Sequence, residues 1–306
     1  MPTIIGIDAA WTLTEPSGVA LVTSRGGGWH CLAVAPSYDS FLAHARGICI
    51  DWDQDRFQGS PPPVADLLQA ARDLAGATVD IVTIDMPVAK ERFDSRRVAD
   101  NDLSRAYGAR GCAVHTPNAE RPGELGWKLV TDFLAAGYPV ATKTHESCGG
   151  PQLVEVYPHP ALLALLREEY RVKYKVSKAR KFWKPAERIP EVVKIFRRIL
   201  EELEKRLGPT GLSIPFESEI RSLARLKRYE DALDALVCAW VGTRYVDGSV
   251  DAFGDGTAAI FCPRISSPMS LLSRTPRSSR PAGMARRGCL ASSRPGDRRP
   301  NCRTRR

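Results

Sequence analysis

The sequence has no apolar run that approaches the roughly 20 residues needed to cross a bilayer as a helix. Its first residues lack the basic start and long apolar stretch that are typical of a signal peptide. Eight cysteines are present, but none forms a C-x-x-C pair, so the sequence does not predict a zinc ribbon. These absences lead us to expect a cytoplasmic protein with free thiols.

One segment has almost no negative charge, and its many arginines account for the net positive charge of the whole chain. Residues 264–306 contain twelve arginines, no lysine and one acidic residue, whereas residues 1–263 contain 32 basic and 34 acidic residues. The segment is rich in Ser, Pro and Gly and lacks apolar periodicity, which predicts a disordered tail. Three interpretations stay open: an arm that binds nucleic acid, a product of out-of-frame translation, or a solvated extension without a function.

Hydrophobic patterning in the rest of the chain predicts strands that alternate with helices. Apolar runs indicate strands at residues 4–8, 17–22, 29–34, 79–84 and 153–157, and a final short strand within 253–261. Helical periodicity is found at residues 64–74, 98–107, 125–136, 161–208 with a basic break at 173–184, and 229–245. Residues 35–63 look irregular. We therefore predict an α/β domain over residues 1–263, with a mixed five-stranded sheet, helices on both faces, and helical insertions at about 88–124 and 161–228.

Four aspartates occupy positions that favour a common site. Asp8 ends the first predicted strand and Asp85 the fourth, while Asp231 and Asp234 are three residues apart and therefore share one face of the last helix. Each has an ordinary alternative, because an aspartate after a strand is often a turn former or helix cap. The combination is more specific, because converging carboxylates stay ionised together only where cations neutralise them.

The chain has only five histidines, and oxygen ligands without nitrogen or sulfur suit Mg²⁺ or Mn²⁺. Two such ions about 4 Å apart can activate a water and stabilise a leaving alkoxide during phosphodiester cleavage. The four aspartates therefore predict a site for two Mg²⁺ or Mn²⁺ ions.

Several segments resemble those of a known family. Gly6-Ile7-Asp8-Ala9-Ala10, Ile84-Asp85-Met86-Pro87, residues 155–160 and residues 231–235 resemble a family of predicted RNase H-like nucleases that is widespread in bacteria and archaea. Residues 231–235 are also similar to the corresponding helix of RuvC-type Holliday-junction resolvases. The resemblance covers about residues 3–262. It implies an RNase H-like (ribonuclease H) fold and a metal-dependent nuclease that hydrolyses DNA or RNA.

The resemblance also implies roles for the aspartates. Asp8 would bridge both metal ions, and Asp85 would hold one of them. Asp231 and Asp234 would supply the helix carboxylate and position the attacking water. Glu155 is a further catalytic candidate: it lies within a strand, so it points either into the site or out to solvent, and the resemblance favours the site. His115 and His159 could assist proton transfer, although such histidines are more often structural.

Basic residues interleaved with aromatics suggest contacts with nucleic acid. Arg97 lies in a basic cluster after Asp85, and Lys175, Lys178 and Lys181 lie in a second basic run with Trp183. Such a pattern suits a phosphate backbone with stacked bases, and a solvated helix–loop face explains it equally well. Lys175 or Lys178 could also contact the scissile phosphate.

Two other functions stay open. An ATP-dependent phosphotransferase of the related actin-like fold would need a glycine-containing hairpin after Asp8, where Ala9, Ala10 and Trp11 stand instead. A nucleic-acid-binding protein without catalysis would have no use for four costly carboxylates. The sequence does not fix the oligomeric state, and a homodimer is one option because the resolvases act as dimers.

Overall fold

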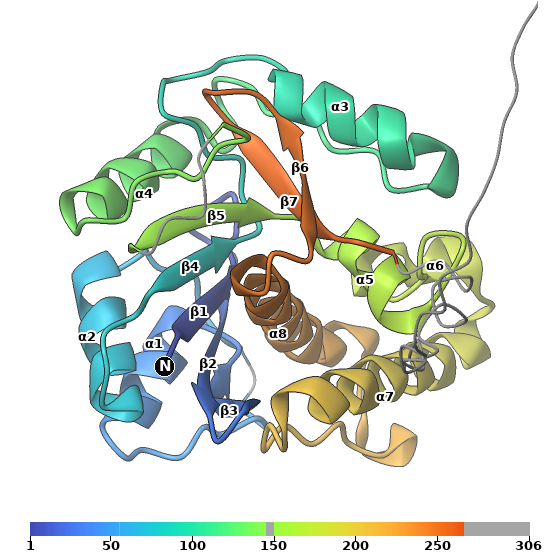
Figure 1. Cartoon of the computed structure of the whole chain (residues 1–306). Coiled ribbons are helices and arrows are strands. Elements are labelled where there is room, and N and C mark those ends of the chain that lie inside the picture. Colours follow the sequence, from blue (N-terminus) through green and yellow to red (C-terminus); the bar gives the residue numbers. More distant parts are fainter. Residues whose placement is uncertain (55, 145–149, 266–306) are drawn as a thin grey trace, which may run out of the picture. The chain divides into compact units, whose positions relative to one another are not determined.

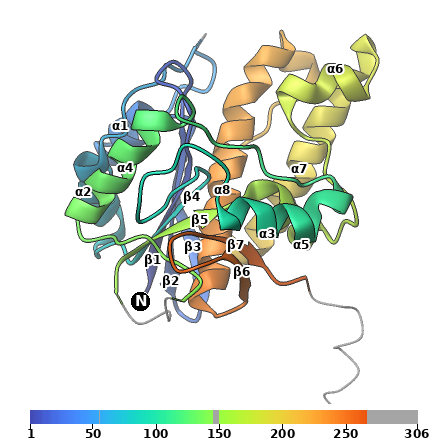
Figure 2. The ribbon, with the colours of Figure 1, turned by 90° about the horizontal axis from the view of Figure 1, so that it is seen from above.

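The computed structural model describes residues 1–54, 56–144 and 150–265, and it shows a mixed α/β fold with a seven-stranded sheet between layers of helices (Figures 1 and 2). The strands are β1 (Thr3–Asp8), β2 (Gly18–Arg25), β3 (Gly28–Ala35), β4 (Ile81–Ile84), β5 (Gln152–Val156), β6 (Val250–Gly254) and β7 (Ala259–Pro263). The α-helices are α1 (Tyr38–Ala45), α2 (Val64–Ala75), α3 (Val98–Tyr107), α4 (Gly123–Ala135), α5 (Pro158–Leu166), α6 (Ala179–Phe182), α7 (Arg188–Leu207) and α8 (Lys227–Val246).

The strand order is β3-β2-β1-β4-β5-β7-β6. Neighbouring strands are parallel from β1 through β4 and β5 to β7, and β2 and β6 run antiparallel to their neighbours. The predicted count of five strands is wrong, and so is the single strand expected within 253–261. The Asp255 carboxylate accepts hydrogen bonds from the Thr257 N–H at 2.8 Å and the Thr257 hydroxyl at 2.7 Å. This turn folds the segment into the β6–β7 hairpin, which extends the sheet by two strands.

Helices cover both faces of the sheet, as predicted. One apolar core joins the sheet to α5, α7 and α8, and a second joins the other face to α1, α2 and α4. Figure 2 shows these two sets on opposite sides of the strands. A third core packs α3 against β6 and β7. The helical stretch predicted over 161–208 has the expected break, which is wider than predicted: α5 ends at Leu166, the short helix α6 follows, and α7 begins at Arg188.

Helix α1 lies in a region that the sequence pattern left irregular. Its first N–H groups are capped by Ser37, whose hydroxyl accepts from the Ser40 N–H at 3.1 Å. Tyr38 and Phe41 bury one face of this helix. Eight residues are too few for a clear helical period, so packing decides the structure here. No helix in the described part of the chain is long and apolar enough to cross a membrane.

Helix α8 packs directly on the backbone of β1 and β2. A Cβ atom on Gly6 would lie 2.4 Å from both the Ala235 oxygen and the Ala239 nitrogen, and a Cβ on Gly18 would lie 2.1 Å from the Asp231 oxygen. Only glycine at these two positions allows such an approach. These contacts fix the position of α8 along β1, and so determine which residues of α8 lie beside each residue of β1.

The Gly6→Ala variant is expected to lose about 1–3 kcal/mol of unfolding free energy, because the added methyl would overlap the α8 backbone. Urea denaturation measures the change. Gly28→Ala is the matched control, since the same methyl there would meet nothing closer than 3.9 Å and the position is exposed. Equal stability of the two variants would contradict the close packing of α8 on β1.

Candidate functional site

Two aspartates lie where adjacent parallel strands end. Asp8 is the last residue of β1, and Asp85 follows β4 directly. The register pairs Ile7 with Ile84, and the Asp85 N–H donates to the Ile7 carbonyl oxygen at 2.9 Å. Ligands of α/β proteins commonly bind at the carboxyl ends of such strands. This edge is therefore the natural place for a site.

Both aspartates lie on the face of the sheet that α8 covers. Side chains alternate between the faces along a strand, and Ile7 and Ile84, one position earlier, belong to the core on the opposite face. Thr83, two positions before Asp85, donates its hydroxyl to a backbone carbonyl of α8 at 2.8 Å. Alternation thus directs Asp8 and Asp85 toward α8.

The N-terminal half of α8 supplies the other two aspartates. Asp231 is 1% exposed and Asp234 is fully buried. The backbone of Asp231 contacts Gly18, which is the residue paired with Asp8 across the β1–β2 ladder. This contact places the α8 aspartates beside the ends of β1 and β4. We call Asp8, Asp85, Asp231 and Asp234 the acidic group.

Asp234 receives two hydrogen bonds from one loop segment. The Tyr174 hydroxyl donates to Oδ1 at 2.7 Å, and the Lys175 ammonium donates to Oδ2 at 2.5 Å. Burial lowers the pKa of Lys175, but Asp234, Tyr174 and Glu230 outweigh that effect and hold the pKa well above its ordinary value. Lys175 is therefore a charged partner of the acidic group, and its side chain is 22% exposed.

Asp231 and Glu230 share a second lysine. The Lys227 ammonium donates to Asp231 Oδ1 and, at 3.0 Å, to Glu230 Oε1. Glu230 also accepts from the Val176 N–H at 2.5 Å. The other carboxylate oxygen of Asp231, Oδ2, is buried and has no hydrogen-bond partner among the described residues. Such an orphan atom is rare in a folded protein and is open to a ligand.

Burial and mutual repulsion raise the pKa of three carboxyl groups. Burial is the largest cause for Asp85, and the charge of Asp8 adds to it, whereas Lys175 opposes it. Burial likewise raises the pKa of Asp234 to about 7, against Lys175 and with the charge of Asp8. The pKa of Asp231 is raised by burial and by Asp8, against its lysine partner. At these three carboxyl groups, burial and the charge of Asp8 thus outweigh the two lysines.

No three His, Cys, Asp or Glu side chains within residues 1–54, 56–144 and 150–265 are placed so that they could hold a metal ion together. Two of the four carboxylates are engaged by lysines, Asp231 by Lys227 and Asp234 by Lys175. The structure therefore brings the predicted aspartates to one place without forming a closed set of metal ligands.

Glu155 lies apart from the acidic group. Its neighbours along β5, Val154 and Val156, belong to the core on the α8 face, so Glu155 points to the opposite face. There both of its carboxylate oxygens accept from Arg97, at 2.6 and 2.7 Å, and Oε2 also accepts from the Val88 N–H at 2.9 Å. Burial raises the pKa of Glu155, and Arg97 opposes that shift. The Glu155 side chain thus lies on the opposite face of the sheet from the four aspartates, and its charge still raises the pKa of Asp85.

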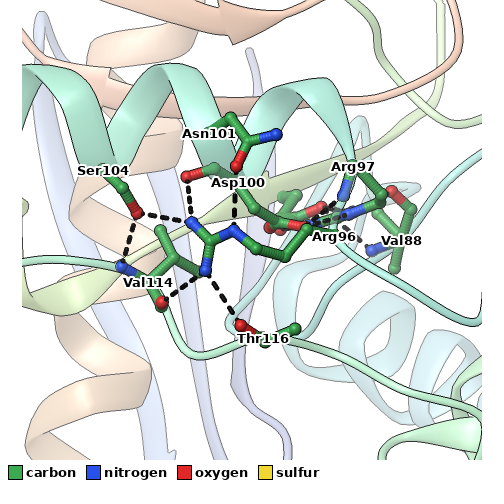
Figure 3. A network of polar contacts seen from close by, with 9 residues as sticks. Val88, Arg96, Arg97, Asp100, Asn101, Ser104, Val114 and Thr116 are labelled. Atoms are coloured by element: carbon green, nitrogen blue, oxygen red, sulfur yellow. Dashed lines mark hydrogen bonds and ion pairs between the residues drawn. The ribbon is translucent and has the colours of Figure 1, made fainter.

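Arg97, predicted to bind nucleic acid, is buried inside this polar network (Figure 3). Its guanidinium donates to both oxygens of Asp100, at 2.7 and 3.1 Å, and to the Val88 carbonyl oxygen at 2.7 Å, besides its two bonds to Glu155. All five guanidinium N–H groups are thereby used. The burial of Arg97 places it out of reach of a nucleic acid backbone.

The other predicted nucleic-acid contacts are distributed unevenly. Lys178 and Lys181 are exposed, and Trp183 is half-buried against the core beside α7. Lys175 belongs instead to the acidic group's surroundings. Of the three lysines predicted to contact nucleic acid, two are therefore exposed to solvent and one contacts the carboxylates.

The two histidines differ in their surroundings. His115 is exposed. His159 is buried, its Nε2 lies 2.5 Å from the Arg171 guanidinium, and its Nδ1 has no partner among the described residues. Burial, followed by nearby lysine and arginine, lowers the pKa of His159 well below its ordinary value. His159 packs edge-on against Tyr174, which binds Asp234.

Sequence reasoning missed three neighbours of the acidic group: Tyr174, Lys227 and Glu230. Lys227 stands four residues before Asp231 on the same helix, and this i,i+4 spacing is a signal that could have identified it. Tyr174 is 60 residues from Asp234 along the chain. No local pattern predicts that contact.

Comparisons with known proteins give a family and no activity. A search of curated proteins finds no match. The family described as "Protein of unknown function (DUF429)" matches residues 6–259, which includes the whole acidic group. The match spans well over half of the 306 residues. The chain therefore belongs to the DUF429 family.

Proposed function

We propose that the protein is a metal-dependent nuclease that hydrolyses phosphodiester bonds in DNA or RNA at the acidic group. The observation that carries this proposal is the convergence of four aspartates from β1, the end of β4, and α8 on one face of the sheet. Buried like charges are costly unless a cation neutralises them. Burial, together with the charge of Asp8, outweighs the lysines and raises the pKa of Asp85, Asp231 and Asp234, as expected for buried carboxyl groups.

The donor atoms of the acidic group are of the chemical type that suits a hard divalent cation, and to bind one together they must move closer than the described residues place them. All are carboxylate oxygens, which Mg²⁺ and Mn²⁺ prefer, and the buried Oδ2 of Asp231 lacks any partner among the described residues. The proposal requires Lys175 and Lys227 to release Asp234 and Asp231. Both lysine side chains reach solvent, with exposures of 22% and 40%, so they can rehydrate when they leave.

The four aspartates would hold two Mg²⁺ or Mn²⁺ ions, which supply an activated water and stabilise charge on the phosphate when bound. Asp8 raises the pKa of Asp85, Asp231 and Asp234 alike, which suits the central ligand position that the sequence resemblance implies. Tyr174 restrains Asp234 in one orientation through its hydroxyl. Lys175 offers a cation to the substrate phosphate once it leaves Asp234.

An RNase H-like fold is part of the proposal. The β2–β3 hairpin next to β1, the parallel strands β4 and β5, and the helices on both faces support it. The β6–β7 hairpin is then an extension of the five-stranded core. Exposed Lys178 and Lys181, with Lys173 over the Phe182 ring at 5.5 Å, offer a basic and aromatic surface for nucleic acid.

The proposal predicts that purified protein cleaves at least one of single-stranded, duplex, RNA–DNA hybrid or branched substrates when Mg²⁺ or Mn²⁺ is present. EDTA is expected to abolish the cleavage, and added Mn²⁺ to restore it, because the acidic group depends on a cation. Gel analysis of labelled substrates measures the products. Absence of cleavage of every substrate with either metal would contradict the proposal.

A further inference from the structure

A pocket of about 290 Å³ lies between the segment that follows β4 and helix α4. Pro87 and Pro122 are buried in its wall, and the rings of Phe93 and Trp127 are half-buried in it. This volume is at the lower end of the roughly 300–1,000 Å³ typical of small-molecule pockets. The pocket therefore suits one flat ring system better than a large ligand.

The two aromatic rings of this pocket are held in place by cations. The Arg92 guanidinium lies 5.2 Å from the centre of the Trp127 ring, and the Arg97 guanidinium lies 4.9 Å from the centre of the Phe93 ring. Arg97 is itself fixed by its bonds to Glu155. Rigid aromatic walls reduce the entropy lost when a planar ligand stacks against them.

The rim of the pocket offers both donors and acceptors. Arg92 donates to both oxygens of Glu124, at 2.5 and 3.1 Å, and both side chains are largely exposed. Asp94, also exposed, adds a further carboxylate. A nucleobase has donor and acceptor atoms along its edge and two π faces, so these walls and this rim fit it. The mixed charge of the rim does not favour a bare phosphate.

The pocket lies next to the acidic group along the chain. Pro87 lines it, and Asp85 is two residues earlier, so the two Cα atoms are at most about 7 Å apart. One nucleotide advances about 3.4 Å along a stacked strand. Asp85 faces α8 and α4 covers the opposite face of the sheet, so a strand with a base in the pocket would reach the acidic group by passing around the carboxyl ends of β1 and β4.

We propose that this pocket binds an unpaired nucleobase of a single-stranded DNA or RNA segment next to the acidic group. The inference rests on the proposed nuclease function for its substrate class, and it names single-stranded segments, rather than continuous duplex, as the preferred ligand. Only a base that is out of the double helix can place its face against the rings that line the pocket.

Binding of a single strand of about 12 thymidines with one central 2-aminopurine tests the proposal without catalysis when EDTA is present. We expect wild type to quench the 2-aminopurine fluorescence. Trp127→Leu is expected to weaken binding on the order of 10- to 100-fold and to abolish the quenching, because stacking is lost. Trp127→Phe, which keeps a ring, is expected to stay within a few-fold of wild type.

Trp29→Leu is the matched control. Trp29 is also half-buried, but it lies in β3 beside the turn of the β2–β3 hairpin. This turn is near the start of β1, at the other end of the strands from Asp8 and Asp85. The Trp29→Leu variant should bind the oligonucleotide like wild type, and thermal unfolding should show that all variants are folded. The proposal is overturned if Trp127→Leu binds as tightly as Trp29→Leu, or if a fully paired duplex shows the same dependence on Trp127.

The binding test in EDTA and the cleavage assay with Mg²⁺ or Mn²⁺ together separate the two proposals. Binding that depends on Trp127, without any cleavage, would support the base pocket and contradict the nuclease proposal. Metal-dependent cleavage, with binding that does not depend on Trp127, would support the nuclease proposal and contradict the base pocket.

Discussion

Asp8→Asn is expected to lower the rate of metal-dependent phosphodiester cleavage by at least about 100-fold. Metal ions contribute several kcal/mol to transition-state stabilisation, and about 1.36 kcal/mol corresponds to a tenfold change in rate. Asp8 ends β1 and acts electrostatically on each other member of the acidic group. Its amide would keep the shape of the side chain and remove the charge that holds the cation.

The same variant should fold normally. Asp8 is only partly buried, and its replacement removes one of several mutually repelling carboxylates. Urea denaturation is therefore expected to show unfolding free energy that is unchanged or higher than that of wild type. Cleavage rates measured with a saturating concentration of Mn²⁺ give the activity.

Asp73→Asn is the matched control for Asp8→Asn, because Asp73 is an exposed aspartate on α2 that bonds only to Gln69 in the described contacts. It should keep the wild-type rate. If the cleavage rate of Asp8→Asn is within a few-fold of that of Asp73→Asn, the acidic group is not the site of catalysis, even if the protein cleaves nucleic acid.

The positions of the four aspartates could be predicted because local rules fix them. Asp8 and Asp85 follow apolar runs that must be buried strands, and parallel strands end at a common edge. Asp231 and Asp234 share a helix face by their spacing alone. Helix α8 then reaches β1 because glycine at positions 6 and 18 leaves room for it. Local patterns therefore determine both the strand ends and the helix face that meets them.

Glu155 shows where such rules stop. Because Glu155 lies between two apolar residues of a strand, its side chain is predicted to point to the opposite face of the sheet from theirs. The sequence does not say which face of β5 packs against α8. The answer depends on the packing of Val154 and Val156 against α5, α7 and α8. Lys175 is a similar case, since its contact with Asp234 spans 59 residues and depends on the path of the loop after α5. The β6–β7 hairpin, by contrast, had a local signal in Asp255-Gly256.

Arg97→Met is expected to be the most destabilising single substitution considered, with a loss of about 3–5 kcal/mol of unfolding free energy. Arg97 is the cation between two buried carboxylates, Asp100 and Glu155, and it bonds to all four of their oxygens. Methionine fills much of the same volume but leaves both charges unpaired in the interior. Urea denaturation at neutral pH measures the loss.

Arg105→Met is the matched control, on helix α3, which Arg97 directly precedes. Arg105 forms an exposed pair with Asp102, with 78% of its side chain accessible, and such pairs contribute at most about 1 kcal/mol. If Arg97→Met is no more destabilising than Arg105→Met, the buried network does not stabilise the fold.

The loss in Arg97→Met should also depend on pH in a defined direction. Burial already raises the pKa of Glu155 above its ordinary value of 4.5, and Arg97 opposes that shift, so its removal raises the pKa further. A folded-state pKa above the unfolded value means that the folded state binds more protons, so stability falls as pH rises from about 4.5 through the raised pKa. The destabilisation of Arg97→Met relative to wild type is therefore expected to be smaller at pH 5 than at pH 8.

Adding Glu155→Gln to Arg97→Met should reduce this pH dependence, because the glutamine cannot ionise. A double variant whose stability depends on pH as strongly as that of Arg97→Met would show that another group is responsible.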